Sequence, residues 1–228
     1  MQDFRFQNSY LKLELESDAD QSVFREIFLD RDYLMCEDVI RKAKVILDIG
    51  AHIGLFSIYC RCLNNGVKIF SYEPDERNYL ILKKNLDVNK ISGVKIKNLA
   101  IFDKCGDLEF FNRKDSHNSS LLKSDDESVS KKVTTIDFET VFSQLERQSI
   151  SIVDLVKMDI EGAEFFIFEK ISEKILNKIK SFCIEYHEGK HETKTSKDII
   201  NLLKKNKFDV KIYPSRYEKK LGIIFAWK

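Results

Sequence analysis

The fold of this chain is decided by residues 44–59, which read KVILDIGAHIGLFSIY. The apolar run from Val45 to Ile49 is rich in β-branched residues and predicts a buried strand. Gly50 and Gly54 follow it, and apolar residues then recur at helical spacing. A strand, a glycine turn and a helix open a nucleotide-binding α/β unit, in which the helix N-terminus lies close to the ligand. Because glycine has no side chain, neither Gly50 nor Gly54 would block the ligand's approach.

The following residues continue this alternation of strand and helix. An apolar run at 67–74 predicts the second strand, and Pro74 ends it because proline donates no backbone hydrogen bond. Alternation over the first hundred residues predicts parallel βαβ units with right-handed crossovers, so the ligand site should lie at the carboxyl ends of the strands. We predict further strands at 94–99, 106–111, 133–136, 152–159, 181–187, 211–214 and 221–227, the last two as an antiparallel hairpin, and helices at 75–86, 137–147, from 164 and at 196–205.

Two parts of the chain precede or interrupt this pattern. Residues 1–43 contain an alternating stretch at 10–16, which predicts a strand, and helical patterns from Asp18 and from Leu34. We therefore divide the chain into an N-terminal extension, 1–43, and a nucleotide-binding domain, 44–228. The extension could lie over the mouth of the ligand site or could cover a sheet edge. Residues 113–132 are polar and rich in serine, and we expect a loop there.

Polar residues stand at the predicted carboxyl ends of the strands: Asp48, Glu73, Asp103, Asp159 and His187. Glu73 follows Asp48 by 25 positions, where an acid can accept hydrogen bonds from both ribose hydroxyls. An acid at Asp48 would repel a pyrophosphate but suits a ligand with ammonium and sulfonium centres. The pattern therefore favours S-adenosylmethionine over a dinucleotide.

The composition limits the other function classes. The 228 residues carry a net charge of +1, so nothing in the overall charge demands a nucleic-acid partner. The chain shows no signal peptide and no apolar run long enough to span a membrane, and we expect a cytoplasmic protein. Its five cysteines form no CxxC pair, and we expect reduced, mostly buried thiols.

Three blocks together resemble the FkbM family of S-adenosylmethionine-dependent methyltransferases. They are the LDIGAHIG stretch at 47–54, the YEP stretch at 72–74 and the VKMDIEGAE stretch at 156–164, and the Ser119–Ser120 segment is also similar. The resemblance implies an α/β, Rossmann-like class I methyltransferase fold, whose sheet is seven-stranded and mostly parallel with an antiparallel C-terminal strand. His52 stands where the family usually has Asn. The predicted cofactor-binding residues are Asp48, Gly50, His52, Gly54, Glu73, Pro74, Ala100, Ser119, Ser120 and Asp159.

The resemblance also implies O-methylation of a sugar, glycan or other hydroxyl-bearing natural product. A hydroxyl is a weak nucleophile, so methyl transfer requires alignment and a group that removes its proton. We consider Asp159, Glu161 and His187 as candidates for that base. Lys157 shares a strand face with Asp159 and could pair with it or hold the acceptor oxygen. Asp159, Glu185 and His187 could also offer ligands to a divalent metal, but their spacing matches no compact metal motif and we assign no metal ligand.

Two other function classes remain open from the sequence. A nucleic-acid or protein methyltransferase would favour an Asn-Pro-Pro-Tyr type motif or a basic stripe, and the chain has neither. A non-catalytic module that binds an adenosyl ligand would not need the acids at the strand ends. We therefore expect a small-molecule or glycan acceptor and no nucleic-acid partner. The sequence identifies neither the acceptor nor the oligomeric state.

Overall fold

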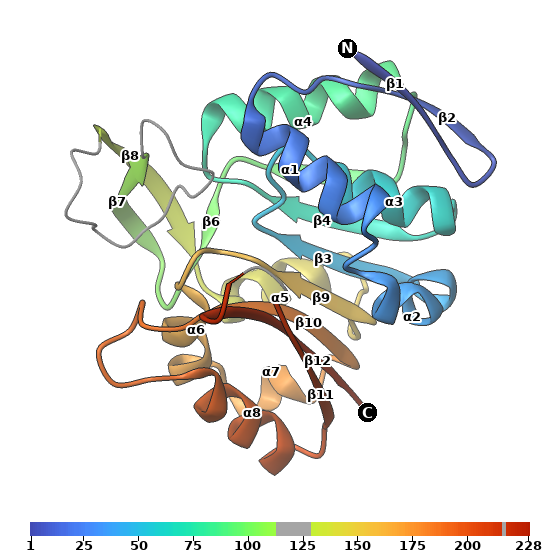
Figure 1. Ribbon diagram of the computed structural model, residues 1–228. Coiled ribbons are helices and arrows are strands. Elements are labelled where there is room, and N and C mark those ends of the chain that lie inside the picture. The colour runs from blue at the N-terminus through green and yellow to red at the C-terminus, as the bar shows by residue number, and fades with distance from the viewer. Residues whose placement is uncertain (113–128, 216–217) are drawn as a thin grey trace.

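The computed structural model describes residues 1–112, 129–215 and 218–228, and its centre is a seven-stranded sheet (Figure 1). The parallel strands are β5, β4, β3, β9 and β10, whereas β12 runs antiparallel to both β10 and β11. This arrangement confirms the predicted fold class, including the antiparallel hairpin at the C-terminus. In sheet order the strands are β11 (Asp209–Pro214), β12 (Leu221–Trp227), β10 (Ser181–His187), β9 (Leu155–Met158), β3 (Val45–Ile49), β4 (Lys68–Tyr72) and β5 (Val94–Lys97).

Helices cover both faces of this sheet and form two separate apolar layers with it. Figure 1 shows α1, α3 and α4 toward the top of the molecule and α6, α7 and α8 toward its bottom, and we name the two layers upper and lower accordingly. The upper set consists of α1 (Asp18–Phe24), α2 (Glu37–Lys42), α3 (Leu55–Leu63) and α4 (Glu76–Val88), with short helical turns at Arg25–Leu29 and Leu34–Cys36. The lower set consists of α5 (Phe138–Glu146), α6 (Glu164–Lys170), α7 (Glu173–Leu176) and α8 (Ser196–Lys205).

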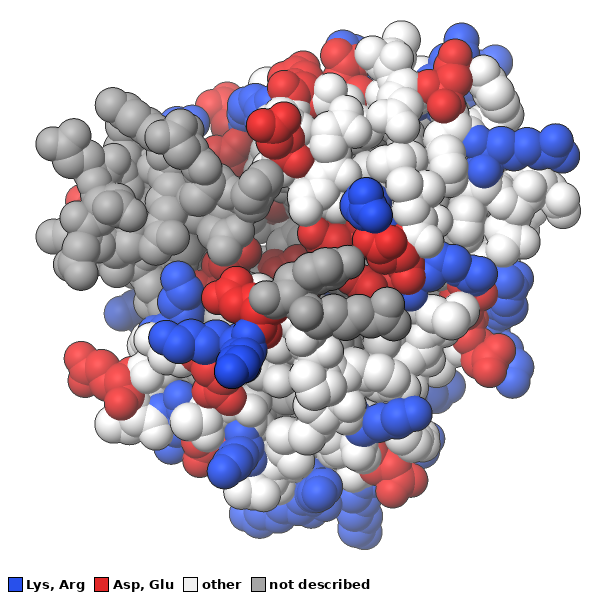
Figure 2. Space-filling view, viewed as in Figure 1, with Lys and Arg blue, Asp and Glu red and all other residues white. Residues whose placement is uncertain are grey.

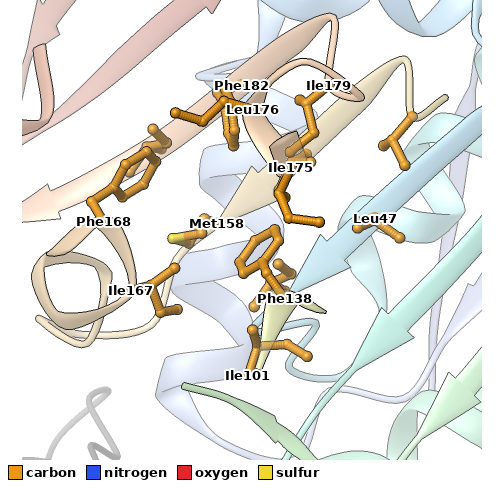
Figure 3. Close-up of a cluster of buried hydrophobic side chains, with 14 of the residues drawn as sticks. Leu47, Ile101, Phe138, Met158, Ile167, Phe168, Ile175, Leu176, Ile179 and Phe182 are labelled. Carbon is orange, nitrogen blue, oxygen red and sulfur yellow. The ribbon is translucent and has the colours of Figure 1, made fainter. Parts of the chain in front are cut away.

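Strand β3 lies in the middle of both layers and is buried along its whole length. Its odd positions, including Leu47, pack in the lower cluster with Met158 and Phe138 (Figure 3). Its even position Ile46 packs in the upper cluster. Successive side chains of a strand point to opposite faces, so Asp48 shares the upper face with Ile46. The acid of the predicted cofactor motif therefore points toward α3.

The N-terminal extension packs against the upper layer. It begins with a hairpin of β1 (Gln2–Phe6) and β2 (Ser9–Leu13), of which the first strand was not predicted from the sequence. Phe4 packs edge-on against Phe24 at 5.0 Å between ring centroids. The Asn85 amide of α4 donates hydrogen bonds to the Glu14 and Ile53 carbonyls. Residues 1–43 thus share an apolar cluster with the domain that follows them.

A small second sheet extends beside the main one. Its order is β6 (Ala100–Ile101), β8 (Val129–Ile136) and β7 (Gly106–Asn112). The expected loop over 113–132 is wrong at its end, because β8 begins at Val129. Residues 113–128 lie outside the described residues. Pairing with β7 extends this strand through Lys131 and Lys132, which are exposed and carry no apolar signal.

Two further expectations can be compared with the described residues. All five cysteines are free, and Cys36, Cys60 and Cys183 are buried. Of the helices in the described part of the chain, none has the length and apolar character that crossing a membrane requires.

Candidate functional site

A cleft of about 750 Å³ lies at the carboxyl ends of β3, β4, β9 and β10. Figure 2 shows Asp and Glu side chains gathered around the hollow in the middle of this face. Parallel strands place their carboxyl ends at one sheet edge, so residues distant in sequence meet there. The lining includes residues of the glycine turn, of the segment after β4, of β6, of the ends of β9 and β10, and of α1.

The glycine turn allows the end of β9 to approach β3 closely. Gly50 has φ of +73°, and a Cβ atom there would lie 1.9 Å from the Asp159 carbonyl oxygen. Gly54 has φ of +86° and precedes α3, where a Cβ would lie 2.9 Å from Leu82 Cγ. The first glycine therefore permits contact between two strand ends. The second permits α3 to pack against α4, and it does not line the cleft.

His52 connects this turn to the N-terminal extension. It lines the cleft and has φ of +49°. Its Nε2 lies 3.4 Å from Oδ1 of Asp20, which is fully buried in α1. Burial lowers the pKa of His52, and the neighbouring Asp20 carboxylate offsets part of this effect. The neutral imidazole thus links α1 to the glycine turn.

Glu73 presents a fixed carboxylate to the cleft. Its Oε2 accepts the His52 backbone N–H at 2.8 Å, and its Oε1 accepts the Asp75 N–H at 2.9 Å. Burial raises the pKa of Glu73 to about 7, although both backbone donors favour the ionised form. Each oxygen keeps capacity for a further hydrogen bond from a ligand hydroxyl. Pro74, the next residue in the chain, also lines the cleft, as does Ala100 of β6.

Asp48 lies beneath the cleft and does not line it. It is fully buried, and its Oδ2 accepts a hydrogen bond from the Ser57 hydroxyl of α3 at 2.6 Å. Its Oδ1 lies 3.9 Å from Lys157 Nζ. Burial raises the pKa of Asp48, and the Lys157 charge counters that rise. The structure gives this acid an ion-pairing neighbour inside the protein, and direct contact with a cofactor stays a prediction.

Lys157 supports the cleft floor as a buried cation. Its Nζ donates to the Gly50 carbonyl at 2.7 Å and lies 3.5 Å from Asp159 Oδ2. The expected pairing of Lys157 with Asp159 is therefore present. Burial alone would lower the pKa of Lys157, but the Asp159 and Asp48 carboxylates outweigh burial and raise it. The ammonium fixes the glycine turn and the Asp159 side chain relative to each other.

His187 joins two carboxylates at the end of β10. Its Nδ1 lies 3.1 Å from Glu164 Oε1, which also accepts the His187 backbone N–H at 2.8 Å. Its Nε2 lies 3.3 Å from Glu161 Oε2. Burial alone would lower the pKa of His187, but the hydrogen bond that it donates to Glu164 and the Glu161 charge raise it to about 10. This imidazole is therefore charged at neutral pH in the protein alone.

Glu161 and Glu185 add negative charge to the same end of the cleft. Glu161 has φ of +56°, a conformation that few residues adopt and that is often found at functional sites. Burial raises its pKa to about 7, and the charge of His187 opposes this rise. Burial and the Asp159 charge raise the pKa of Glu185 well above its usual value. Among the described residues, Asp159, Glu161 and His187 form a group that could hold a metal ion.

The structure thus brings most of the predicted site residues to one cleft. Its lining includes the predicted Gly50, His52, Glu73, Pro74, Ala100, Lys157, Asp159, Glu161 and His187. The predicted Ser119 and Ser120 lie outside the described residues. No site role was predicted for Glu164, which holds His187. The extension was expected either to lie over the mouth of the site or to cover a sheet edge, but none of the α1 residues that line the cleft was named. An amphipathic helix pattern carries no signal for such a role, because it reports only which side is apolar.

Comparisons with known proteins agree with this architecture. A family model described as the methyltransferase FkbM domain matches residues 48–210. Methyltransferase sdnD of Sordaria araneosa is 27% identical over 197 residues, which cover 74% of this chain and 75% of that protein. The 31-O-demethyl-FK506 methyltransferase FkbM of Streptomyces tacrolimicus is 31% identical over 86 residues, covering 38% of this chain and 33% of that protein.

Solved structures show the same fold at low identity. The crystal structure of methyltransferase FkbM from Methylobacillus flagellatus KT has a TM-score of 0.56 and 15% identity. That similarity covers 81% of this chain and 44% of the longer one, so this chain spans less than half of it. The METTL16 MTase domain has a TM-score of 0.57 and 14% identity, covering 96% of this chain and 73% of that one.

Proposed function

The chain belongs to the FkbM methyltransferase family, and we propose that it transfers a methyl group from S-adenosylmethionine to a hydroxyl group of a small molecule or glycan. The observation that carries the oxygen acceptor is the group of Asp159, Glu161 and His187, whose polar side-chain atoms lie within 4.8 Å of one another in the cleft. A relative's name, 31-O-demethyl-FK506 methyltransferase, also states methylation at an oxygen for that protein.

The donor fits one end of the cleft by its chemistry. Glu73 is buried and held by two backbone N–H groups, so its carboxylate is oriented before a ribose arrives. Gly50 and His52 line the cleft at the glycine turn, just before the N-terminus of α3, and helix N-termini favour polar ligands. We assign this end to the adenosyl group.

The acceptor hydroxyl must lose a proton, and the carboxylates at the acidic end of the cleft can take it. In the reaction the C–S bond breaks and its electron pair stays on sulfur. A new O–CH₃ bond forms, and the hydroxyl proton passes to a carboxylate, either Asp159 or Glu161. Lys157 orients the first of these carboxylates and His187 the second, at 3.5 and 3.3 Å. The products are S-adenosylhomocysteine and a methyl ether.

The N-terminal extension contributes to the same cleft. Ser22 of α1 and Glu26 of the helical turn that follows line the cleft, and Asp20 holds α1 near His52. We propose that this segment forms part of the acceptor's binding surface. Its acids, together with those of the strand ends, disfavour a polyanionic acceptor because nucleic-acid binding relies on cations that neutralise phosphates.

The proposal is tested with methyl-labelled S-adenosylmethionine and a panel of sugar nucleotides, glycan extracts and polyol natural products. The product should carry its label as a methyl ether, identified by NMR. Of Asp159→Asn and Glu161→Gln, the one that removes the base should abolish turnover while binding of S-adenosylhomocysteine persists. Glu192→Gln, an exposed acid outside the cleft, is the matched control and should keep full turnover. Label found on nitrogen or carbon would overturn the assignment of the acceptor, and absence of donor binding would overturn the whole proposal.

A further inference from the structure

The acidic end of the cleft brings together three side chains of the kinds that bind metal ions. Asp159 follows β9, Glu161 lies in the turn after it, and His187 ends β10. One ligand atom from each lies within 4.8 Å of the others. Ligand atoms bound to one ion at about 2.1 Å lie no more than about 4.2 Å apart. A pair of these atoms at the 4.8 Å limit would need to close in by about 0.6 Å or more to share an ion.

We propose that Asp159, Glu161 and His187 bind a divalent first-row cation such as Mn²⁺, held at the acceptor end of the cleft. The role of the ion in the reaction rests on the proposed function, whereas its binding does not. The ion would face the acceptor hydroxyl and make its proton easier to remove. Two carboxylates and one imidazole suit Mn²⁺, Fe²⁺ or Zn²⁺ better than Ca²⁺, which prefers oxygen ligands alone.

The orientation of His187 supports this site. Metal-binding histidines commonly present one ring nitrogen to the ion while a carboxylate or carbonyl holds the other nitrogen. Here Glu164 holds Nδ1 at 3.1 Å, and Nε2 points toward Glu161. Glu164 is itself fully buried, and its Oε2 accepts the Gly162 N–H at 2.8 Å. The carboxylate that orients the imidazole is therefore fixed from both sides.

The local charge also favours a cation. Asp159, Glu161 and Glu185 line this end of the cleft, and Glu164 lies directly behind it. Lys157 Nζ, 3.5 Å from Asp159 Oδ2, offsets part of this negative charge, and the remaining carboxylates favour a bound cation.

The site is open on the side that a ligand would occupy. The Asp159 side chain is 31% exposed and that of Glu161 is 17% exposed, whereas that of His187 is 3% exposed. All three residues line the cleft. Catalytic metal sites keep positions free for water or substrate, and three protein ligands at a cleft wall leave such positions.

Binding can be measured on the full chain without turnover. We would titrate Mn²⁺ and follow the free ion by electron paramagnetic resonance, with calorimetry as a second readout. The wild type should bind one ion per chain. Glu161→Gln and Asp159→Asn should each weaken binding by about tenfold or more, because each removes one ligand charge. Both substitutions are at partly exposed positions, and donor binding by each variant checks that it has folded.

The matched control is Glu169→Gln. Glu169 lies 3.7 Å from His191, a second carboxylate–imidazole pair that is outside the cleft. This variant should bind Mn²⁺ as the wild type does. Absence of stoichiometric binding, or binding that neither cleft variant weakens, would overturn the site. If donor binding and methyl transfer persist after a chelator has removed all divalent ions, the ion has no role in the reaction, and the proposed function stands.

Discussion

Donor affinity should depend on pH through Glu73. This carboxyl has a pKa of about 7 in the protein because it is buried, with a contribution from the Asp75 charge that Lys157 opposes. Ribose hydroxyls donate to a carboxylate, so binding favours the ionised form and should strengthen as pH rises. About one tenth of the carboxyl is ionised at pH 6 and about nine tenths at pH 8, so affinity should rise about tenfold between them.

The suitable ligand for this measurement is 5′-methylthioadenosine. It carries the ribose but lacks the α-amino group of the full donor, which itself titrates near pH 8. Calorimetry at pH 6, 7 and 8 gives the affinities, and buffers of different ionisation enthalpy give the protons released on binding. We expect release of close to one proton at pH 6.

A variant isolates the contribution of Glu73. Glu161 lies in the same cleft and also has a pKa of about 7, so it could contribute to the slope. Glu73→Gln should bind more weakly at every pH, because an amide cannot accept both backbone N–H groups, and should lose the pH dependence. Affinity that stays constant from pH 6 to 8 in the wild type, or that falls, would refute the reasoning. An unchanged slope in the variant would do so too.

Three substitutions test the framework of the cleft by chemical denaturation. Gly50→Ala should lower the free energy of unfolding by about 2–4 kcal/mol, since its Cβ would lie 1.9 Å from a carbonyl oxygen, whereas Gly66→Ala, with its nearest atom at 3.5 Å, should change it little. Lys157→Met should lower the free energy of unfolding by about 3–5 kcal/mol, because it leaves buried carboxylates without their cation. Adding Asp48→Asn should recover part of that stability, and strictly additive effects of the two substitutions would contradict the pairing. Asp20→Asn should cost about 1–3 kcal/mol, because the buried carboxylate accepts two backbone N–H groups at the start of α1, and an unchanged unfolding midpoint would count against that role.

Much of the fold follows from local sequence. The apolar run of β3, the glycine turn and the start of α3 are contiguous, so periodicity alone locates them. Strand β1 was not predicted because it is short and its alternation consists of one pair, Phe4 and Phe6. Its pairing with β2 across a tight turn stabilises it. The end of the expected loop was misplaced because β8 begins among polar residues. Their place in a strand comes from pairing with β7, which the polar pattern does not reveal.

The candidate site was predictable where strand ends define it. Glu73, Asp159 and His187 meet because parallel strands place their carboxyl ends at one edge. The direction of Asp48 was not predictable in the same way, since β3 is buried on both faces and alternation does not say which face adjoins the ligand. The contact of Glu164 with His187 joins residues 23 positions apart and depends on how α6 packs under β10.

The measurement that tests the central claim most directly is a crystal structure of the full chain with S-adenosylhomocysteine. We predict ribose hydroxyls within hydrogen-bond distance of the Glu73 carboxylate and a sulfur atom directed toward Asp159 and Glu161. A ligand that binds elsewhere, or one whose sulfur points away from these carboxylates, would contradict it.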